Sequence, residues 1–245
     1  MTIGSKKIFI DRLPSTNSYA ASLLRKGKVQ DGTIVHTGFQ TAGRGQGTNK
    51  WESEPGKNLL FSIILFPSSL KAERQFLISK VLSLGIMDFL STFVDDVTIK
   101  WPNDIYVRSD KIAGMLIENA ITRDEIEHTI AGIGININQA IFRGGAPNAT
   151  SLRLLTGKDQ DLSGCFNKTL SAIDLRYRQL HFEKRSKFSE EYLSSLYMYN
   201  KWAEFSDAHG IFEGRIISVA DSGRIQIEDR KSRIYEYGHG EVEFL

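Results

Sequence analysis

The segment 58–66, NLLFSIILF, is almost continuously apolar, with Ser62 as the one polar residue after its first position. A run of this length without polar alternation predicts a β-strand buried on both faces. Such a strand needs a sheet that is covered on both sides. With 245 residues, of which 41% are hydrophobic and 24% charged, the chain can bury that core in one substantial domain and still form a small second one.

The rest of the chain predicts helices and strands that alternate without a regular βαβ repeat. Further strands are expected at 7–10, 32–40, 97–101, 104–119 and 126–138, and helices at 13–28, 71–93 and across most of 151–205. Ser15 or Thr16 supplies the N-cap of the first helix, and Gly27 ends it. The pattern predicts an α+β fold, a mixed β-sheet with flanking helices.

A change in the pattern of predicted elements near residue 209 predicts a second domain. Short strands with turn residues between them follow one another at hairpin spacing to the end of the chain. We therefore expect a larger domain over 1–206 and a small β domain over 207–245, docked on the first because it is too small to hold a large core alone.

Charge and cysteine content limit the classes of function. The net charge of +2 lacks the basic excess of a nucleic-acid binder. The single cysteine, Cys165, excludes an internal disulfide and fits a reducing compartment. The N-terminus lacks the apolar core of a signal peptide, and no apolar run is long enough to span a bilayer. These features predict a cytoplasmic protein that binds neither nucleic acid nor membrane.

The segment 43–51, GRGQGTNKW, combines three glycines with cations and a tryptophan. Its spacing matches neither the P-loop nor the dinucleotide-binding fingerprint, and a strand rather than a helix follows it. A flexible hairpin tip is one interpretation. The other is an anion-binding loop, in which Arg44 supplies donors and the glycines let backbone N–H groups approach a ligand.

Three further segments carry polar residues or glycines where function is one explanation. In KWPND, Lys100, Asn103 and Asp104 surround Pro102. This segment is either a well-made turn or a site where Asp104 orients a metal ion or a lysine. In 110–119, Lys111 is either a solvated strand end or a fixed cation beside Gly114. The glycines of AGIGININ, 131–138, indicate tight sheet packing or a slot for a thin apolar ligand.

Together with STN at 15–17, these segments resemble in type and order the catalytic core of the biotin protein ligases. The resemblance rests on FQTAGRGQGTNKW, KWPNDIYV, KIAGMLIE and GIGININ and covers nearly the whole chain. It implies a class II synthetase-like catalytic domain with a small SH3-like β-barrel after it. It also implies a two-step reaction, in which MgATP activates biotin as biotinyl-5′-AMP and a lysine of a biotin carboxyl carrier protein then accepts the biotin.

The resemblance assigns roles to particular residues. Lys111, Arg44 and Asp104 are the expected catalytic residues, with Asp104 also expected to meet Mg²⁺. The biotin site is expected to contain Ser15, Thr16, Asn17, Gln40, Gly43, Arg44, Gly45, Gln46, Lys111, Gly114, Gly132, Gly134 and Asn136. The ATP and adenylate site is expected to contain Arg44, Trp51, Lys100, Asn103, Asp104, Lys111 and Asn136.

The sequence departs from the family pattern in the glycine loop and at both ends. Gln46 and Gly47 stand where many members carry arginines, which makes the loop less cationic, although Lys50 is near. Some members have a basic residue after the GEV that here is 240–242, and some have an N-terminal DNA-binding domain for which this sequence has no room. We therefore expect a monofunctional ligase. Exposed sheet edges make a homodimer possible.

Two alternatives remain at this stage. A lipoate or octanoate ligase or transferase shares the fold, but its expected arginine, glycine and histidine pattern is missing, and Cys165 lies in a predicted helix as a structural thiol. A non-catalytic biotin-binding module needs neither Lys111 nor Asp104.

Overall fold

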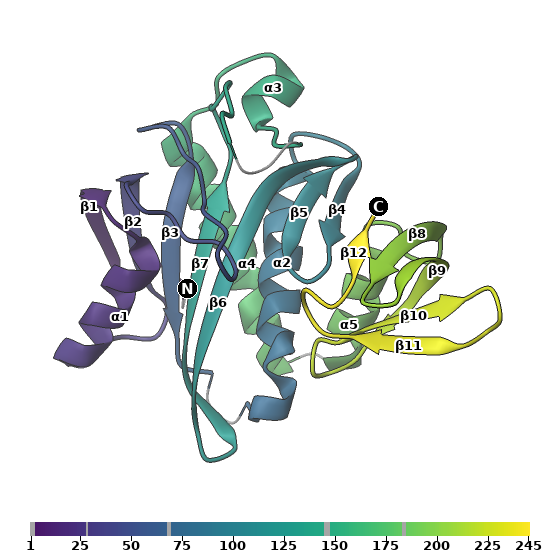
Figure 1. Cartoon of the computed structure of the whole chain (residues 1–245). Coiled ribbons are helices and arrows are strands. Elements are labelled where there is room, and N and C mark those ends of the chain that lie inside the picture. The colour runs from purple at the N-terminus through teal and green to yellow at the C-terminus, as the bar shows by residue number, and fades with distance from the viewer. Residues whose placement is uncertain (1–2, 28, 68–69, 145–147, 183–184) are drawn as a thin grey trace.

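The computed structural model describes residues 3–27, 29–67, 70–144, 148–182 and 185–245. Over these residues the chain forms a seven-stranded sheet and a five-stranded sheet (Figure 1). In the larger sheet, β1 and β2 pair parallel and the other pairs are antiparallel. Its strands are β1 (Lys7–Leu13), β2 (Thr33–Gln40), β3 (Leu59–Leu65), β4 (Val97–Lys100), β5 (Asp104–Val107), β6 (Asp110–Thr122) and β7 (Glu125–Ile135), in the order β1-β2-β3-β7-β6-β5-β4. The predicted mixed sheet is confirmed.

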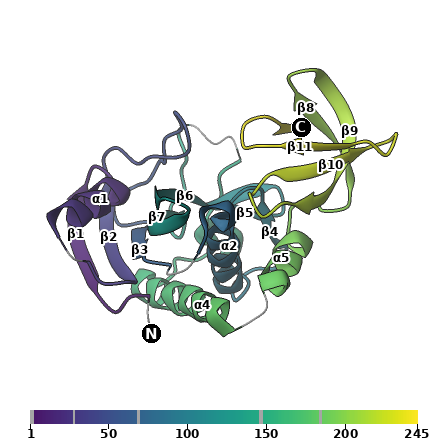
Figure 2. The ribbon, with the colours of Figure 1, turned by 90° about the horizontal axis from the view of Figure 1, so that it is seen from below.

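Helices cover both faces of this sheet (Figure 2). One face carries α1 (Thr16–Lys26); the other carries α2 (Phe76–Leu90), α4 (Leu162–Phe182) and α5 (Arg185–Ser194). The 3-10 helix η1 (Ala72–Arg74) and the short α3 (Leu152–Thr156) lie in connections. As predicted, Ser15 caps α1 by accepting from the Ser18 amide, and Gly27 ends it at φ 148°. No helix among the described residues is long and apolar enough to cross a membrane.

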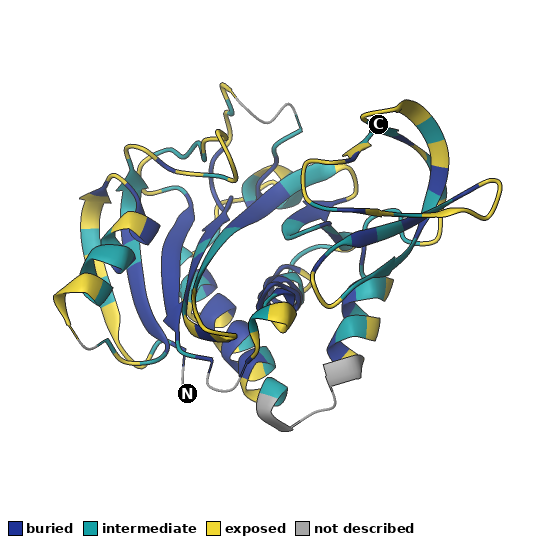
Figure 3. Cartoon of the chain, turned by 60° about the horizontal axis from the view of Figure 1, so that its bottom comes forward, coloured by how far each residue is buried: buried dark blue, intermediate teal, exposed yellow. Residues whose placement is uncertain are grey.

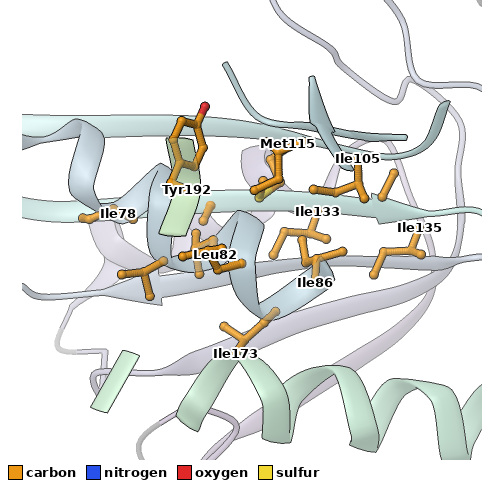
Figure 4. Packing of buried hydrophobic residues seen from close by; sticks show 14 of the residues in the cluster. Ile78, Leu82, Ile86, Ile105, Met115, Ile133, Ile135, Ile173 and Tyr192 are labelled. Atoms are coloured by element: carbon orange, nitrogen blue, oxygen red, sulfur yellow. The ribbon is translucent and has the colours of Figure 1, made fainter. Parts of the chain in front are cut away.

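The central strand β3 is buried along its whole length, as its apolar run predicts. On the α1 face, Val35 and Ile64 pack with Ala20. On the opposite face, α2 lies between the sheet and α4, and its Leu82 and Ile86 belong to the main core (Figure 4). The central strands β3 and β7 are mostly buried, while the edge strand β1 and the outer surface of α1 are largely exposed (Figure 3).

The second sheet starts earlier than predicted. Its strands are β8 (Trp202–Asp207), β9 (Gly210–Val219), β10 (Ile225–Asp229), β11 (Ile234–Tyr237) and β12 (Glu243–Phe244), in the order β11-β10-β9-β8-β12. The helical prediction is therefore wrong at 202–205, where Trp202 pairs with Arg215 and Phe205 with Phe212. Pairing with a strand that comes later in the chain overrides local preference there. We propose that the boundary between the domains lies near residue 201.

Trp101 joins the two sheets. Its indole Nε1, at the end of β4, donates a hydrogen bond of 2.9 Å to the carbonyl of Gly223. Phe205 and Ile216 of the second sheet are fully buried in the same core as α2. The segment after β11 thereby lies against the ends of β4 and β5, where residues 239–240 and 242–244 line a cavity together with Trp101 and Asp104.

Candidate active site

A cavity of about 470 Å³ lies between the glycine loop, the start of α1, strands β4–β7 and the segment after β11. Most of the residues predicted for biotin and ATP line it. They are Ser15, Thr16, Asn17, Gln40, Arg44, Gly45, Gln46, Trp51, Lys100, Asn103, Asp104, Lys111, Gly114, Gly132 and Gly134. Gly43 and Asn136 instead line a second cavity, of about 1050 Å³, which shares Arg44, Trp51 and Lys111 with the first.

One end of the first cavity is a connected set of neutral polar groups. Gln40 Oε1 accepts from the Thr16 amide at 2.8 Å and from Thr16 Oγ1 at 3.1 Å. Ser62 Oγ lies 2.7 Å from Thr16 Oγ1 and 2.6 Å from Asn17 Oδ1. Thr16, Asn17 and Ser62 are buried. Buried polar groups held in this way present fixed donors and acceptors to a polar ligand.

Glycines form the floor of the cavity because successive side chains of β6 and β7 point to opposite faces of the sheet. Met115 and Ile133 point to the main core, whereas Gly114 pairs with Gly134 on the opposite face. A Cβ on Gly134 would lie 2.4 Å from the Trp51 ring, and one on Gly132 would lie 2.2 Å from Asn17 Oδ1. The space above these glycines is therefore taken by two of the protein's own side chains, which then bound the cavity.

The glycine loop is a small hairpin rather than an unstructured tip. Arg44 and Lys50 form a β-bridge, and the Gly45 amide donates to the Asn49 carbonyl at 2.8 Å. Gly47 has φ 62°, a conformation that favours glycine. This dark-blue hairpin crosses in front of β7 and β6 in Figure 1, and it brings Trp51 onto Gly134.

The other end of the cavity is charged. Lys111 Nζ pairs with the Asp104 carboxylate, and both side chains are about a quarter exposed, at 24% and 28%. The backbone of Lys111 is fixed by hydrogen bonds to residues 148 and 150. Lys100 Nζ lies 5.1 Å from the centroid of the Tyr106 ring and 5.2 Å from that of Phe244. The structure thus brings Lys100, Asp104 and Lys111 together around one space.

The second sheet supplies one wall of the cavity, through residues that the sequence did not single out. His239, Val242 and Phe244 line the cavity, and the His239 ring lies 6.0 Å from that of Trp101. Burial lowers the pKa of His239 below its usual value, and the nearby Asp104 carboxylate opposes that change. Burial also raises the pKa of Tyr106.

Two buried polar atoms at the junction of the cavities are unsatisfied. Among the described residues neither Trp51 Nε1 nor Asn136 Oδ1 has a hydrogen-bond partner. The side-chain nitrogen Nδ2 of Asn136 donates to the Thr150 carbonyl at 3.0 Å, which fixes the position of Oδ1. An unpaired donor and an unpaired acceptor at a cavity are the pattern that a polar ligand satisfies.

Two contacting residues were missed from the sequence. Ser62 lies in the apolar strand β3, where a serine is itself a signal of a polar contact. Glu118 is the last residue of KIAGMLIE, and the resemblance assigns it no role. Its carboxylate accepts hydrogen bonds from Arg44 and from Asn17.

Comparisons with known proteins agree with this geometry. The family model for the biotin/lipoate A/B protein ligase family matches residues 9–136. The bifunctional ligase/repressor BirA of Bacillus subtilis is 29% identical over 92% of this chain and 70% of its own length. The biotin–[acetyl-CoA-carboxylase] ligase of Mycobacterium tuberculosis is 27% identical over 69% of this chain and 64% of its own length. The structure of the biotin protein ligase from Aquifex aeolicus in complex with biotin and ATP superposes with a TM-score of 0.80 and 26% identity over 98% of this chain and 99% of that one.

Proposed function

Because the chain belongs to the biotin/lipoate A/B protein ligase family, we propose that it activates biotin with ATP and transfers it to a lysine of a carrier protein. The observation that carries the proposal is one cavity with a neutral polar end at Thr16 and Asn17 and a charged end at Lys111 and Asp104. A ligand with a polar ring, an apolar chain and a carboxylate matches that order.

In the first step a biotin carboxylate oxygen attacks the α-phosphorus of ATP, the biotinyl-adenylate bond forms, and pyrophosphate leaves. The head group is proposed to bind at Ser15, Thr16, Asn17 and Gln40, and the chain to run past the glycine floor. Lys111 then holds the carboxylate and an α-phosphate oxygen together, which serves positioning as well as charge neutralisation. Asn136 Oδ1 and Trp51 Nε1 are available to the adenylate.

In the second step the ε-amine of the carrier lysine attacks the acyl carbon. An amide bond forms, the amine loses a proton, and AMP leaves. The hairpin at 43–51, which crosses the floor, shields the acyl phosphate from water until the carrier arrives. The proposed role of Arg44, Gly45 and Gln46 is to keep that hairpin closed.

The donor set at Asp104 fits a magnesium ion that arrives with ATP. In the described part of the chain, no group of three or more acidic, histidine or cysteine side chains is arranged so that it could hold a metal ion by itself. Magnesium commonly uses one or two carboxylates together with substrate phosphates. Asp104, with Asn103 beside it, would hold the ion, which neutralises phosphate charge when bound.

The proposed partners are biotin, ATP and a biotin carboxyl carrier protein, and the proposed location is the cytoplasm, where ATP is available. The outer strand β1 pairs on one side only within the described sheet, which leaves an edge for a homodimer. Lipoate or octanoate chemistry is the alternative, since the family model covers both. The Mycobacterium tuberculosis and Aquifex aeolicus proteins named above are biotin ligases, which favours biotin.

Pyrophosphate release from ATP by the purified chain tests the proposal, with and without biotin and with no carrier present. We expect release that depends on biotin and stops near one turnover, because the adenylate stays bound. Addition of a biotin carboxyl carrier protein should then restart turnover. Release that depends on lipoate or octanoate instead would favour the alternative, and no release with any of the three acids would contradict a ligase.

A further inference from the structure

We propose that Glu118 is a positioning residue, which holds the glycine hairpin closed and fixes the side chains of the head-group site at the same time. The inference rests on the proposed function and assigns to one carboxylate the coupling between the hairpin and the ligand. Glu118 lies on β6, beyond the glycine floor, at the rim of the second cavity.

The carboxylate bridges two parts of the site that come from distant places in the chain. The Arg44 guanidinium nitrogen Nη2 lies 3.0 Å from Glu118 Oε1 and 2.9 Å from Oε2. Asn17 Nδ2 donates to Glu118 Oε2 at 2.7 Å. Arg44 belongs to the hairpin and Asn17 to the first turn of α1, so the shared acceptor connects their side chains.

Glu118 also determines which way the Asn17 amide faces. Asn17 Nδ2 donates to Glu118 and to the Leu116 carbonyl, so both of its hydrogens are used. Its oxygen therefore turns to the Ser62 hydroxyl, 2.6 Å away. Thr16 Oγ1 lies 2.7 Å from Ser62 Oγ, and Thr16 donates its backbone amide and its hydroxyl to Gln40 Oε1, so the Gln40 side-chain nitrogen is the group that can donate to a ligand.

The exposure of the Arg44–Glu118 pair separates its effect on ligand binding from its effect on the stability of the fold. The side chains of Arg44 and Glu118 are 46% and 42% exposed, and pairs so exposed contribute little to the stability of a fold. Loss of Glu118 should therefore change ligand binding much more than it changes unfolding. This contrast separates a positioning role from a merely structural one.

The test compares Glu118→Gln, Glu118→Asp and the parent, with Glu127→Gln as the control. Glu127 is an exposed carboxylate on the neighbouring strand β7, where the substitution removes the same charge. We measure the rate at which labelled biotinyl-adenylate leaves the enzyme, the KM for biotin, kcat for pyrophosphate release and the melting temperature.

We expect Glu118→Gln to release the adenylate about 5- to 10-fold faster, as the loss of one charge-assisted contact predicts, and to raise the KM for biotin more than it lowers kcat. Its melting temperature should stay at that of the parent. Glu118→Asp should recover part of the retention because it keeps the charge, and Glu127→Gln should behave as the parent. In an Arg44→Ala background, Glu118→Gln should add little to the release rate because its hairpin partner is already gone.

Unchanged adenylate retention in Glu118→Gln would overturn the inference. So would a fall in retention that only follows a fall in melting temperature. If the parent itself forms no biotin-dependent adenylate, the proposed function fails first. The parent measurement thus distinguishes the two failures.

Discussion

At the scale of single residues, the charged end of the cavity is the part of the site with the clearest chemistry. Lys111 contacts Asp104 through its side chain, while its backbone amide and carbonyl bond to residues 148 and 150. The side chain is therefore available to a ligand, and the backbone anchors the strand. Activity and stability can be separated at this position.

Lys111→Ala should reduce biotin-dependent pyrophosphate release by about 10²- to 10³-fold, because a fixed cation next to the reacting phosphate is lost. The melting temperature should change little, since the backbone hydrogen bonds remain. Lys71→Ala is the matched control, because Lys71 is exposed and lies outside the cavity. Normal turnover by the Lys111 variant would contradict the role given to this lysine.

The sequence predicted those site residues that are unusual among their neighbours in the chain. It did not predict those that join the site only through a contact with a distant residue. A lysine at the start of an apolar strand and an aspartate after Pro102 stand out in the sequence, and both line the cavity. Glu118 and His239 do not stand out, because each becomes part of the site through contacts over more than 70 residues of chain. Arg44 reaches Glu118 and Trp101 reaches His239 only after the sheet has formed.

At the scale of elements, the floor of the cavity arises because the side chains of β6 and β7 point alternately to the two faces of the sheet. Large apolar residues face α2, and glycines face the hairpin. These strands and their glycines could be identified from the sequence, because strand periodicity is a local property. The sequence did not predict what lies above them, since Trp51 arrives from a different connection. The same limit explains the error at 202–205, where β8 forms only by pairing with β9.

Gly134→Ala should displace the Trp51 ring, because the new Cβ would lie 2.4 Å from it. Overpacking of this kind costs about 1–3 kcal/mol, and the hairpin should yield before the buried strand does. We expect the Kd for biotin to rise about tenfold, with a smaller effect on the melting temperature. Calorimetric titration with biotin measures the first and thermal unfolding the second. Unchanged affinity would show that the hairpin position does not matter for binding.

At the scale of the whole molecule, the active-site cavity depends on both sheets. The larger sheet provides the floor and both ends, and the segment after β11 provides one wall. The hydrogen bond from Trp101 to the Gly223 carbonyl is a direct link between them. Loss of that link should therefore affect stability and catalysis together.

Trp101→Phe leaves the Gly223 carbonyl without its donor, which should lower the free energy of unfolding by about 1–2 kcal/mol. It should also lower kcat/KM for ATP, because the wall that carries Phe244 loses its support. Urea denaturation and steady-state kinetics measure the two effects. Trp202→Phe is the control, since the Trp202 ring stacks 3.8 Å under the Arg230 guanidinium on the second sheet, away from the cavity. Equal effects of the two substitutions would contradict the link.

The positions of the tryptophans have an optical consequence. The chain contains three, and Trp51 and Trp101 both line the cavity, one above its glycine floor and one at the junction of the sheets. Trp202 lies outside it. Two of the three tryptophans therefore lie within contact distance of a ligand bound in the cavity. Intrinsic fluorescence should therefore report occupancy of the cavity in real time without a dye.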